Sequence, residues 1–306
     1  MMYDVIIAGG GPAGLTAAIY ACRGGLHTLI LERAFAGGQM AISHIIDNYP
    51  GFENEVTGAQ LAHSMKVQAQ KAGAEILTQE IIAFQLDGDV KSITTTKQTF
   101  EAKTVILAMG AVSRKLGIAG EEELIGAGVS YCATCDGAFF KGHEVAVIGG
   151  GNTAVEDAIY LAKFCSKVYL IHRRNQFRAQ NSLVKTAQKL ENVEFVLESI
   201  PEKIVGENTV EALIVSHVAS KKQRTIAVSG IFVAVGQDPK TNLISEKVAL
   251  DKQGYIVAGE DCATNIEAVY CAGDIRTKHI RQIVTAAADG AQAATNAEQY
   301  IQFMEK

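Results

Sequence analysis

Two cysteines and an aspartate in residues 129–140, VSYCATCDGAFF, are the side chains best suited to chemistry in this chain. Cys132 and Cys135 are the only two of the six cysteines that lie within three residues of each other, and Asp136 follows directly. A Cys-x-x-Cys pair can close a small disulfide ring, and its thiolate is the species that attacks another disulfide. A neighbouring carboxyl group can donate and accept protons. We therefore interpret Cys132, Cys135 and Asp136 as a redox-active site.

Two other interpretations of the cysteine pair are open: a structural metal site and a buried, inert pair. A structural zinc site needs about four ligands, and the chain has neither a second Cys-x-x-Cys nor a histidine at finger spacing behind the first. We therefore predict no metal. The remaining cysteines lie singly in apolar or helical contexts, where they are predicted to be small buried side chains; they are Cys22, Cys165, Cys262 and Cys271.

Glycine-rich loops occur on both sides of the cysteine pair. The first is Gly9-x-Gly11-x-x-Gly14, with Pro12 and Ala13 inside it, and the second is Gly149-x-Gly151-x-x-Ala154, with Asn152 and Thr153 inside it. Each follows an apolar strand pattern and opens a helical pattern, as a dinucleotide-binding loop must. The first glycine permits the tight turn, the second lets the backbone approach a pyrophosphate, and the third position packs helix on strand. Free N–H groups at the helix N-terminus favour phosphate.

The strand after each loop ends in a different kind of side chain. The first strand ends at Glu32, whose carboxylate can accept hydrogen bonds from a ribose diol. The second ends at His172, and Arg173, Arg174 and Arg178 follow; guanidinium groups suit a 2′-phosphate. We therefore predict FAD for the first unit and NADP(H) for the second. The alternative for HRRNQFR is a solvated basic turn.

Strand and helix patterns alternate along the whole chain, which predicts an α/β fold with parallel sheets. The length of 306 residues suggests two domains. The formal net charge of −5, without a basic tract, favours neither nucleic acid nor a membrane surface as a partner. No apolar run approaches the roughly 18 residues that would span a bilayer. The N-terminus has no basic region before its first strand, so we expect no signal peptide and a cytoplasmic protein.

With these motifs in order, the chain resembles the low-molecular-weight thioredoxin reductases over nearly its whole length. The shared motifs are GGGPAG, AGGQM, DNYPGF, YCATCDGAFF, IGGGNTAVEDA, HRRNQFRA, CAGDI and RQIVTAAADGAQAA. The resemblance implies a homodimeric flavoprotein with two Rossmann-like three-layer domains. A discontinuous FAD domain is expected at 1–113 and 242–306, and an inserted NADPH domain carrying the redox pair at 114–241. Met109 and the Asn152-Thr153 pair depart slightly from the usual family residues.

The resemblance also carries cofactor contacts onto individual positions. For FAD these are Gly9, Gly11, Pro12, Ala13, Gly14, Glu32, Arg33, Gly37, Gly38, Gln39, Asn48, Gly110, Gly273, Asp274, Arg281, Gln282 and Ile283. For NADPH they are Gly149, Gly151, Asn152, Thr153, Ala154, His172, Arg173, Arg174, Arg178 and Gly236.

The implied activity is thioredoxin-disulfide reduction, with electrons passing from NADPH through FAD and the Cys132–Cys135 pair. By resemblance, Cys135 faces the flavin, Cys132 exchanges with a thioredoxin-like partner, and Asp136 handles the proton. Large disulfide reductases keep their cysteines where this chain has Gly37-Gly38-Gln39-Met40, which contains none. Because nicotinamide, dithiol and partner must take turns, a domain rotation is expected about hinges at 111–116 and 236–242.

Other activities are compatible with parts of this pattern. A reductase of the same architecture could serve another small redox protein or take electrons from ferredoxin, although the intact GGGNTA and HRR motifs argue against ferredoxin. A ferredoxin–NADP⁺ reductase of similar fold would lack the dithiol. From a different class, a redox sensor could hold FAD without turnover.

Overall fold

The computed structural model describes residues 2–43 and 45–304, and the chain divides into two units. The first unit is assembled from Met1–Val112 and Asp238–Lys306, and the second is Ser113–Gln237. Residues 1, 44, 305 and 306, which the predicted FAD domain includes, lie outside the described part. The predicted boundaries, 113/114 and 241/242, fall close to these divisions. Which cofactor each unit holds stays a prediction.

The first unit is built on a seven-stranded sheet of order β3-β2-β1-β6-β5-β4, with β17 also paired to β6. Its strands are β1 (Met2–Ala8), β2 (Thr28–Glu32), β3 (Glu75–Thr78), β4 (Ile81–Gln85), β5 (Lys91–Thr95), β6 (Thr99–Leu107) and β17 (Val269–Cys271). β1 lies parallel to β2 and β6, whereas β4, β5 and β6 run antiparallel. The N-terminal part of β6 pairs with β5 and its C-terminal part with β17, so a segment from the end of the chain joins the sheet.

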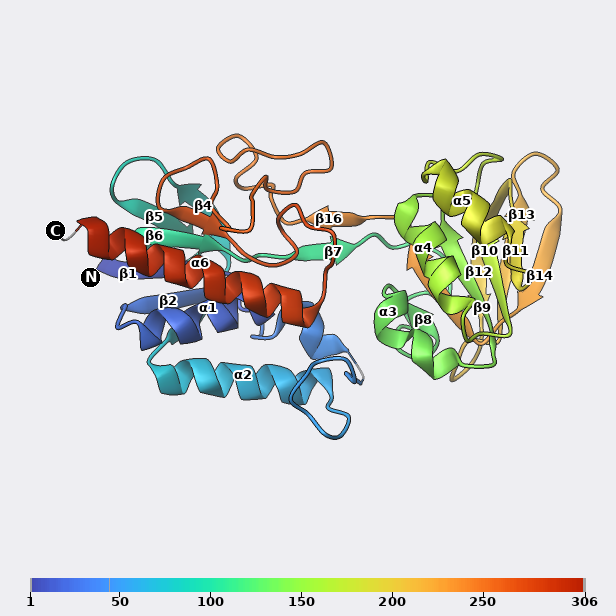
Figure 1. The fold of residues 1–306 in the computed structure, drawn as a ribbon, viewed down its shortest axis with the longest axis horizontal. Helices are drawn as coiled ribbons and strands as arrows, with labels where there is room; N and C mark the ends of the chain where they lie inside the picture. The colour runs from blue at the N-terminus through green and yellow to red at the C-terminus, as the bar shows by residue number, and fades with distance from the viewer. Residues whose placement is uncertain (1, 44, 305–306) are drawn as a thin grey trace. The chain divides into compact units, whose positions relative to one another are not determined.

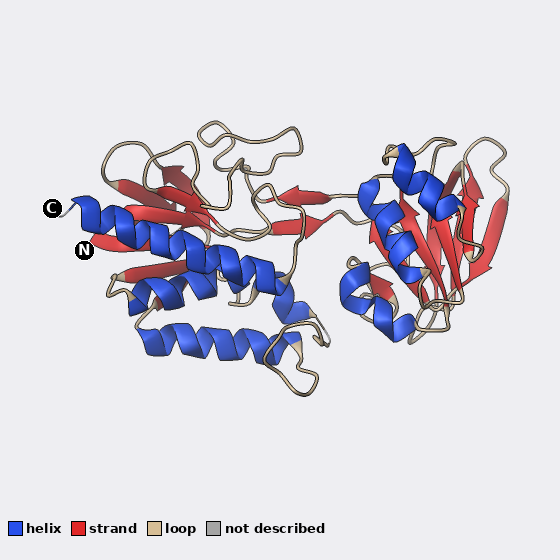
Figure 2. Ribbon diagram, in the orientation of Figure 1, coloured by secondary structure: helices blue, strands red, loops and turns tan. Residues whose placement is uncertain are grey.

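Helices from both ends of the chain cover one face of this sheet (Figures 1 and 2). They are α1 (Pro12–Arg23), α2 (Gly58–Ala72) and α6 (Ile283–Met304), with the short η1 (Gly38–Ile42) before α2. α6 packs directly on α1: a Cβ on Gly290 would lie 2.2 Å from the Ala13 carbonyl oxygen. Only glycine permits that approach, which explains how the C-terminal helix completes a domain begun at the N-terminus.

The second unit has three layers around a five-stranded parallel sheet of order β11-β10-β9-β15-β8. Its strands are β8 (Val129–Ser130), β9 (Glu144–Gly149), β10 (Lys167–Ile171), β11 (Val193–Val196) and β15 (Gly230–Ala234). An antiparallel sheet covers one face, formed by β12 (Ser199–Val205), β13 (Ala212–His217) and β14 (Gln223–Ala227). Helices cover the other: α3 (Ala133–Asp136), η2 (Gly137–Phe140), α4 (Asn152–Leu161) and α5 (Asn181–Gln188).

Strand β9 shows why both faces of this sheet are covered. Val145 and Val147 pack toward the helices, whereas Ala146 and Ile148 pack toward the antiparallel sheet. Successive side chains of a strand point to opposite faces, so an unbroken apolar run requires a layer on each side. The predicted α/β class, with one Rossmann-like domain inserted in another, is confirmed.

The two chain crossings between the units pair with each other. β7 (Ala111–Ser113) and β16 (Gln237–Pro239) form a two-stranded sheet. Its ends are closed by hydrogen bonds from the Arg114 amide to the Gly236 carbonyl and from the Lys240 amide to the Gly110 carbonyl, each 3.0 Å. The predicted hinges, 111–116 and 236–242, include this sheet, and the rotation about them stays a prediction. Among the described residues, no helix is both long and apolar enough to cross a membrane.

Candidate active site and nucleotide sites

The redox pair lies at the N-terminal end of a short helix that follows the edge strand β8. Cys132 and Cys135 are joined by a disulfide. The amides of Cys135 and Asp136 both donate to the Cys132 carbonyl oxygen, at 3.2 and 3.1 Å, which closes the turn of α3. Both cysteines are partly exposed. A disulfide held in a tight turn and reachable from solvent is suited to thiol–disulfide exchange.

Ser130 joins Asp136 to this turn, and the sequence analysis missed it. Its Oγ lies 2.5 Å from Oδ2 of Asp136 and accepts a hydrogen bond from the Cys132 amide at 3.1 Å. Ser130 is 5% exposed. A serine two residues before a tight turn often bonds to the backbone N–H two residues on, and that pattern was the available signal.

The loop after the cysteines packs tightly on α4. A Cβ on Gly137 would lie 2.8 Å from Cδ2 of Leu161 and 3.2 Å from Cζ of Phe164. The thiol of Cys165 donates to the Phe140 carbonyl oxygen at 3.4 Å. These contacts pack the loop after the cysteines against the second unit's core.

The same helix carries a carboxyl group with a shifted pKa. Burial raises the pKa of Asp157, one turn before Leu161 on α4, to about 7, and nearby Glu156 adds to the rise.

The first glycine loop has the geometry of a phosphate cradle. Gly9 has φ +106°, and a Cβ there would lie 2.4 Å from the Ala108 carbonyl oxygen. A Cβ on Gly14 would lie 1.9 Å from the Gly9 carbonyl oxygen, whereas one on Gly11 would meet nothing within 4 Å. The outer glycines thus allow close packing, and the middle glycine faces open space where a pyrophosphate can approach.

Glu32 lies beside this loop at the end of β2. Its Oε2 accepts from the Gly10 amide at 2.7 Å, and its Oε1 accepts from the Ala34 amide at 3.2 Å. The Gly37 amide donates to the Gly10 carbonyl at 2.7 Å, and Gly38 packs near Gly11. Glu32 and the residues at 37–38 therefore lie beside the first glycine loop, and the contact of Glu32 with a ribose stays a prediction.

Two buried polar atoms near the start of α6 lack a partner. Oδ1 of Asp274 and Nε of Arg281 have no hydrogen-bond partner among the described residues. The Arg281 guanidinium lies over the Tyr255 ring at 4.1 Å, and Asn48 Nδ2 donates to Gln282 Oε1 at 3.2 Å. Burial raises the pKa of Asp274. Buried polar groups are costly unless paired, so these atoms fit a polar ligand such as the ribityl chain and ring of FAD.

A buried ion cluster supports the turn that carries Asp274. Asp289, 7% exposed, accepts from the Gly273 amide at 2.9 Å, from Arg276 at 2.8 and 2.9 Å, and from Lys278 at 2.7 Å. Although burial alone would raise it, the pKa of Asp289 is lowered overall by these hydrogen bonds and by the charge of Lys278. The sequence analysis assigned no role to Asp289, although it lies inside the RQIVTAAADGAQAA motif, because its partners are not adjacent to it in the sequence.

The second glycine loop resembles the first, with a closely packed first glycine and a middle glycine that faces open space. A Cβ on Gly149 would lie 2.3 Å from the Ala234 carbonyl oxygen, and one on Gly151 would meet nothing within 4 Å. His172 is 6% exposed and lies against Gly150, with its ring stacked on Phe177 at 5.0 Å. Burial lowers the pKa of His172. The histidine therefore supports the loop through packing, and its direct contact with a coenzyme stays a prediction.

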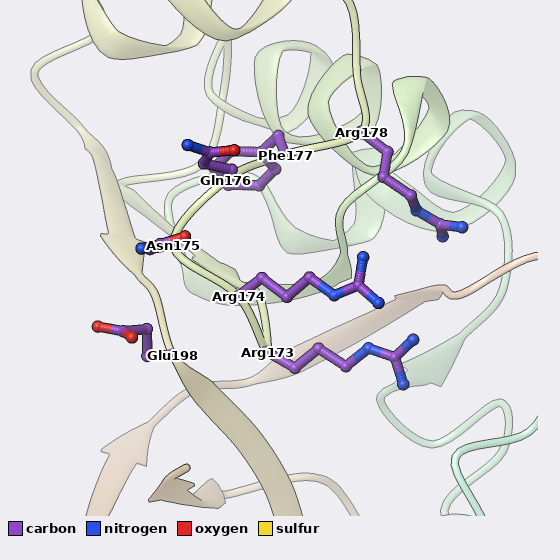
Figure 3. A pocket seen from close by; sticks show the side chains of 7 residues that line it. All are labelled: Arg173, Arg174, Asn175, Gln176, Phe177, Arg178 and Glu198. Carbon is purple, nitrogen blue, oxygen red and sulfur yellow. The ribbon is translucent and has the colours of Figure 1, made fainter. Parts of the chain in front are cut away.

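Three arginines line an open pocket beside this loop. The pocket has a volume of about 390 Å³ and is lined by Arg173, Arg174, Asn175, Gln176, Phe177, Arg178 and Glu198. In Figure 3 the side chains of Arg173, Arg174 and Arg178 extend to one side, and Glu198 points the other way. All three arginines are exposed. The pocket thus presents concentrated positive charge with planar donors, which suits a phosphate group.

The remaining predicted residues lie in three places. Arg33, Gln39 and Ile283 lie just after β2, in η1 and at the start of α6, on the segments around the first loop. Gly110 and Gly236 instead lie beside the paired crossings β7 and β16, where φ is +67° and +118°. Thr153 is exposed and Ala154 buried in the first turn of α4. Contacts of these residues with a cofactor stay predictions.

The model of one family, Pyridine nucleotide-disulphide oxidoreductase, matches residues 3–290. The chain belongs to this family. It is 45% identical to a thioredoxin reductase of Peptoclostridium acidaminophilum, over 98% of each chain. Its fold matches the thioredoxin reductase of Streptococcus pyogenes with a TM-score of 0.93 and 39% identity, over 99% of each chain. A ferredoxin-flavin thioredoxin reductase of Clostridium acetobutylicum matches with 31% identity and a TM-score of 0.53, over 100% and 99% of the chains.

These similarities place the chain among the thioredoxin reductases, as the motifs predicted. As a member of this family, it is an oxidoreductase that works with FAD and a pyridine nucleotide. The matched residues include both glycine loops and the disulfide. The choice between the two pyridine nucleotides stays a prediction.

Proposed function

We propose that this protein reduces the disulfide of thioredoxin or a thioredoxin-like protein with electrons from NADPH. The observation that carries the proposal is the Cys132–Cys135 disulfide, which lies next to Asp136 in the unit with the arginine pocket. The curated relatives at 45% and 44% identity bear the name thioredoxin reductase. When bound, FAD supplies the two-electron carrier between a nicotinamide and a disulfide.

The first unit contributes binding and orientation. Gly11 and the N-terminus of α1 would hold the pyrophosphate, and Glu32 would accept hydrogen bonds from the ribose of the adenosine. Asp274 Oδ1 and Arg281 Nε, which have no hydrogen-bond partner among the described residues, would be available to polar groups of FAD. The Asn48–Gln282 hydrogen bond holds two further polar side chains at the same end of the unit.

The second unit contributes the thiols and the proton. Two-electron reduction of the Cys132–Cys135 disulfide yields one thiol and one thiolate when a single proton is supplied. Asp136, the first carboxyl group after the pair, supplies that proton. Cys132 then attacks the partner's disulfide, the partner releases one thiolate, and Cys135 attacks the mixed disulfide to release the second. The pair returns to its oxidised form, and the partner leaves with two thiols once its two thiolates have taken the proton that Cys135 gives up and a second proton from solvent.

Coenzyme choice follows from the arginine pocket. Arg173, Arg174 and Arg178 enter no ion pair with a described residue, so their charge is available to a ligand. A 2′-phosphate is present in NADPH and absent from NADH. We therefore infer NADPH as the coenzyme. From the family resemblance we also infer a homodimer that acts in the cytoplasm.

A second candidate function is a reductase supplied by ferredoxin. The similarity to the Clostridium acetobutylicum protein favours it, because that protein is a ferredoxin-flavin thioredoxin reductase. The arginine pocket supports NADPH instead, since a ferredoxin-supplied enzyme has no use for a 2′-phosphate site.

The test is NADPH-dependent reduction of an aromatic disulfide by the purified yellow protein, with and without thioredoxin. The proposal expects NADPH oxidation that depends on thioredoxin, and FAD released on denaturation. Reduction that occurs only with reduced ferredoxin would select the second candidate. A folded protein that cannot bind FAD would contradict both.

A further inference from the structure

The Ser130 hydroxyl group links Asp136 to the redox turn. It can form a hydrogen bond with the Asp136 carboxyl group whether that group is ionised or protonated. We propose that Ser130 is a positioning residue that holds Asp136 in place through the whole cycle of proton release and uptake. The proposal rests on the proposed function, because it assigns Asp136 the role of proton donor and acceptor. Ser130 itself contacts neither partner nor cofactor in this account.

Three distances around the serine hydroxyl define its possible bonds. Its Oγ lies 2.5 Å from Oδ2 of Asp136 and 3.3 Å from the carbonyl oxygen of Cys132. The Cys132 amide donates to the same Oγ at 3.1 Å. A distance of 2.5 Å is typical of a hydroxyl donating to an ionised carboxylate, which is among the stronger hydrogen bonds in proteins.

A hydroxyl group has one proton to donate and two lone pairs to accept, so the bonds can be assigned for each state. When Asp136 is ionised, the hydroxyl donates to Oδ2 and accepts from the Cys132 amide. When Asp136 is protonated, its acid group donates to Oγ, and the serine proton turns toward the Cys132 carbonyl. Every group keeps a partner in both states. Neither state therefore drives the carboxyl group away from the cysteines.

The strand that carries Ser130 keeps this hydroxyl in position. Ser130 is 5% exposed and lies in β8, where it pairs with Phe232 of β15; the preceding Val129 pairs with Ile231. A buried strand residue has little rotational freedom, and few waters can replace its hydroxyl. Loss of the hydroxyl should therefore displace Asp136 or leave the Cys132 amide without its partner.

The experiment separates the two half-reactions of the FAD-loaded protein by stopped flow. Flavin reduction by NADPH reports the first step, and reoxidation by oxidised thioredoxin reports the thiol step. The variants are Ser130→Ala, Ser130→Thr, Asp136→Asn and the double variant S130A/D136N. Ser199→Ala is the matched control, since Ser199 is 7% exposed in the same unit and its hydroxyl bonds only to the Leu197 carbonyl among described residues.

The proposal expects Ser130→Ala to slow the thiol step about tenfold while flavin reduction by NADPH stays within twofold, because general acid–base catalysis is worth about 10²–10⁴ and positioning is part of it. Ser130→Thr, which keeps the hydroxyl, should recover most of the rate. The double variant should match Asp136→Asn, since residues that act through one another are not additive. Ser130→Gly removes the same hydroxyl and replaces Ser130→Ala if that variant does not fold.

Two results would overturn the proposal. One is a Ser130→Ala thiol step within twofold of the native rate. The other is a double variant whose loss equals the product of the two single losses. If the native protein itself fails to reduce thioredoxin or an aromatic disulfide, the proposed function fails first, and that outcome is visible before any variant is compared.

Discussion

The amide of Arg178 donates to the carbonyl oxygen of Gly150 at 2.8 Å, so the arginine loop is bonded directly to the second glycine loop. A second link joins the same loops, since the Gln180 amide donates to Oδ1 of Asn152 at 2.9 Å. His172 packs under Gly150 and adds a contact from the core. These bonds fix the separation of the two loops, as recognition of one coenzyme by both of them would require.

This arrangement predicts coenzyme preference. A hydrogen bond to a charged group is worth about 1.5–3 kcal/mol, so two arginines should favour NADPH over NADH by at least about tenfold. Replacing Arg173 and Arg174 with alanine should weaken binding of 2′,5′-ADP by tenfold or more and leave binding of 5′-AMP nearly unchanged, as measured by calorimetry. Arg224→Ala, an exposed arginine of the same unit paired with Glu194, is the control. Equal affinity of the native protein for both ligands would contradict the assignment.

Replacement of Asp289 in the buried ion cluster should lower the stability of the first unit strongly. Asp289→Asn leaves Arg276 and Lys278 as buried charges without a carboxylate, and breaking a buried pair costs roughly 3–5 kcal/mol. Urea unfolding of the FAD-loaded variant should show that loss, together with faster release of FAD because the Gly273 amide loses its charged acceptor. Gln299→Ala, at an exposed position on the same helix, should change neither quantity. An Asp289→Asn protein as stable as the native one would show that the cluster is not structural.

The two cysteines should differ in which one a partner traps. If Cys132 is the exchange thiol, Cys135→Ser should form a stable mixed disulfide with a thioredoxin that lacks its resolving cysteine. Cys132→Ser should form none, because the remaining thiol is the flavin-facing one. Non-reducing gels and mass spectrometry identify the adduct. An adduct seen only with Cys132→Ser would reverse the two roles.

The raised pKa of Asp157 should make the free energy of unfolding depend on pH. Its pKa in the folded protein is raised from 3.8 to about 7, so the folded state favours the protonated acid. The contribution of this group is full below the unfolded pKa of 3.8 and is lost as pH rises from there through about 7. Asp157→Asn should therefore differ little from the native free energy of unfolding near pH 4 and exceed it by about 1–2 kcal/mol near pH 8, after allowance for partial exposure. Glu156→Gln, an exposed neighbour, should show a much smaller pH dependence. A constant difference between native protein and Asp157→Asn would contradict the raised pKa.

Sequence patterns predicted the features that depend on local spacing. The two glycine loops, Glu32 and the Cys132–Cys135 pair lie where the motifs placed them, because glycine geometry and strand ends are local properties. Asp289 and Tyr255 were missed because their roles depend on partners brought close by folding: Asp289 bonds to Gly273 from a different segment, and Tyr255 lies under Arg281. Ser130 was missed although its partners Cys132 and Asp136 lie within six residues of it. The contact of His172 with a coenzyme stays a prediction, whereas its burial against Gly150 results from packing that no spacing rule contains.

The stoichiometry of electron transfer tests the central claim most directly. With native protein, excess oxidised thioredoxin and limiting NADPH, two new thioredoxin thiols should form for each NADPH consumed. The same assay with Cys132→Ser should form none, although NADPH still reduces the flavin. Thioredoxin thiols produced at the native rate by Cys132→Ser, or NADPH consumed by native protein without any thiol formed, would contradict the account.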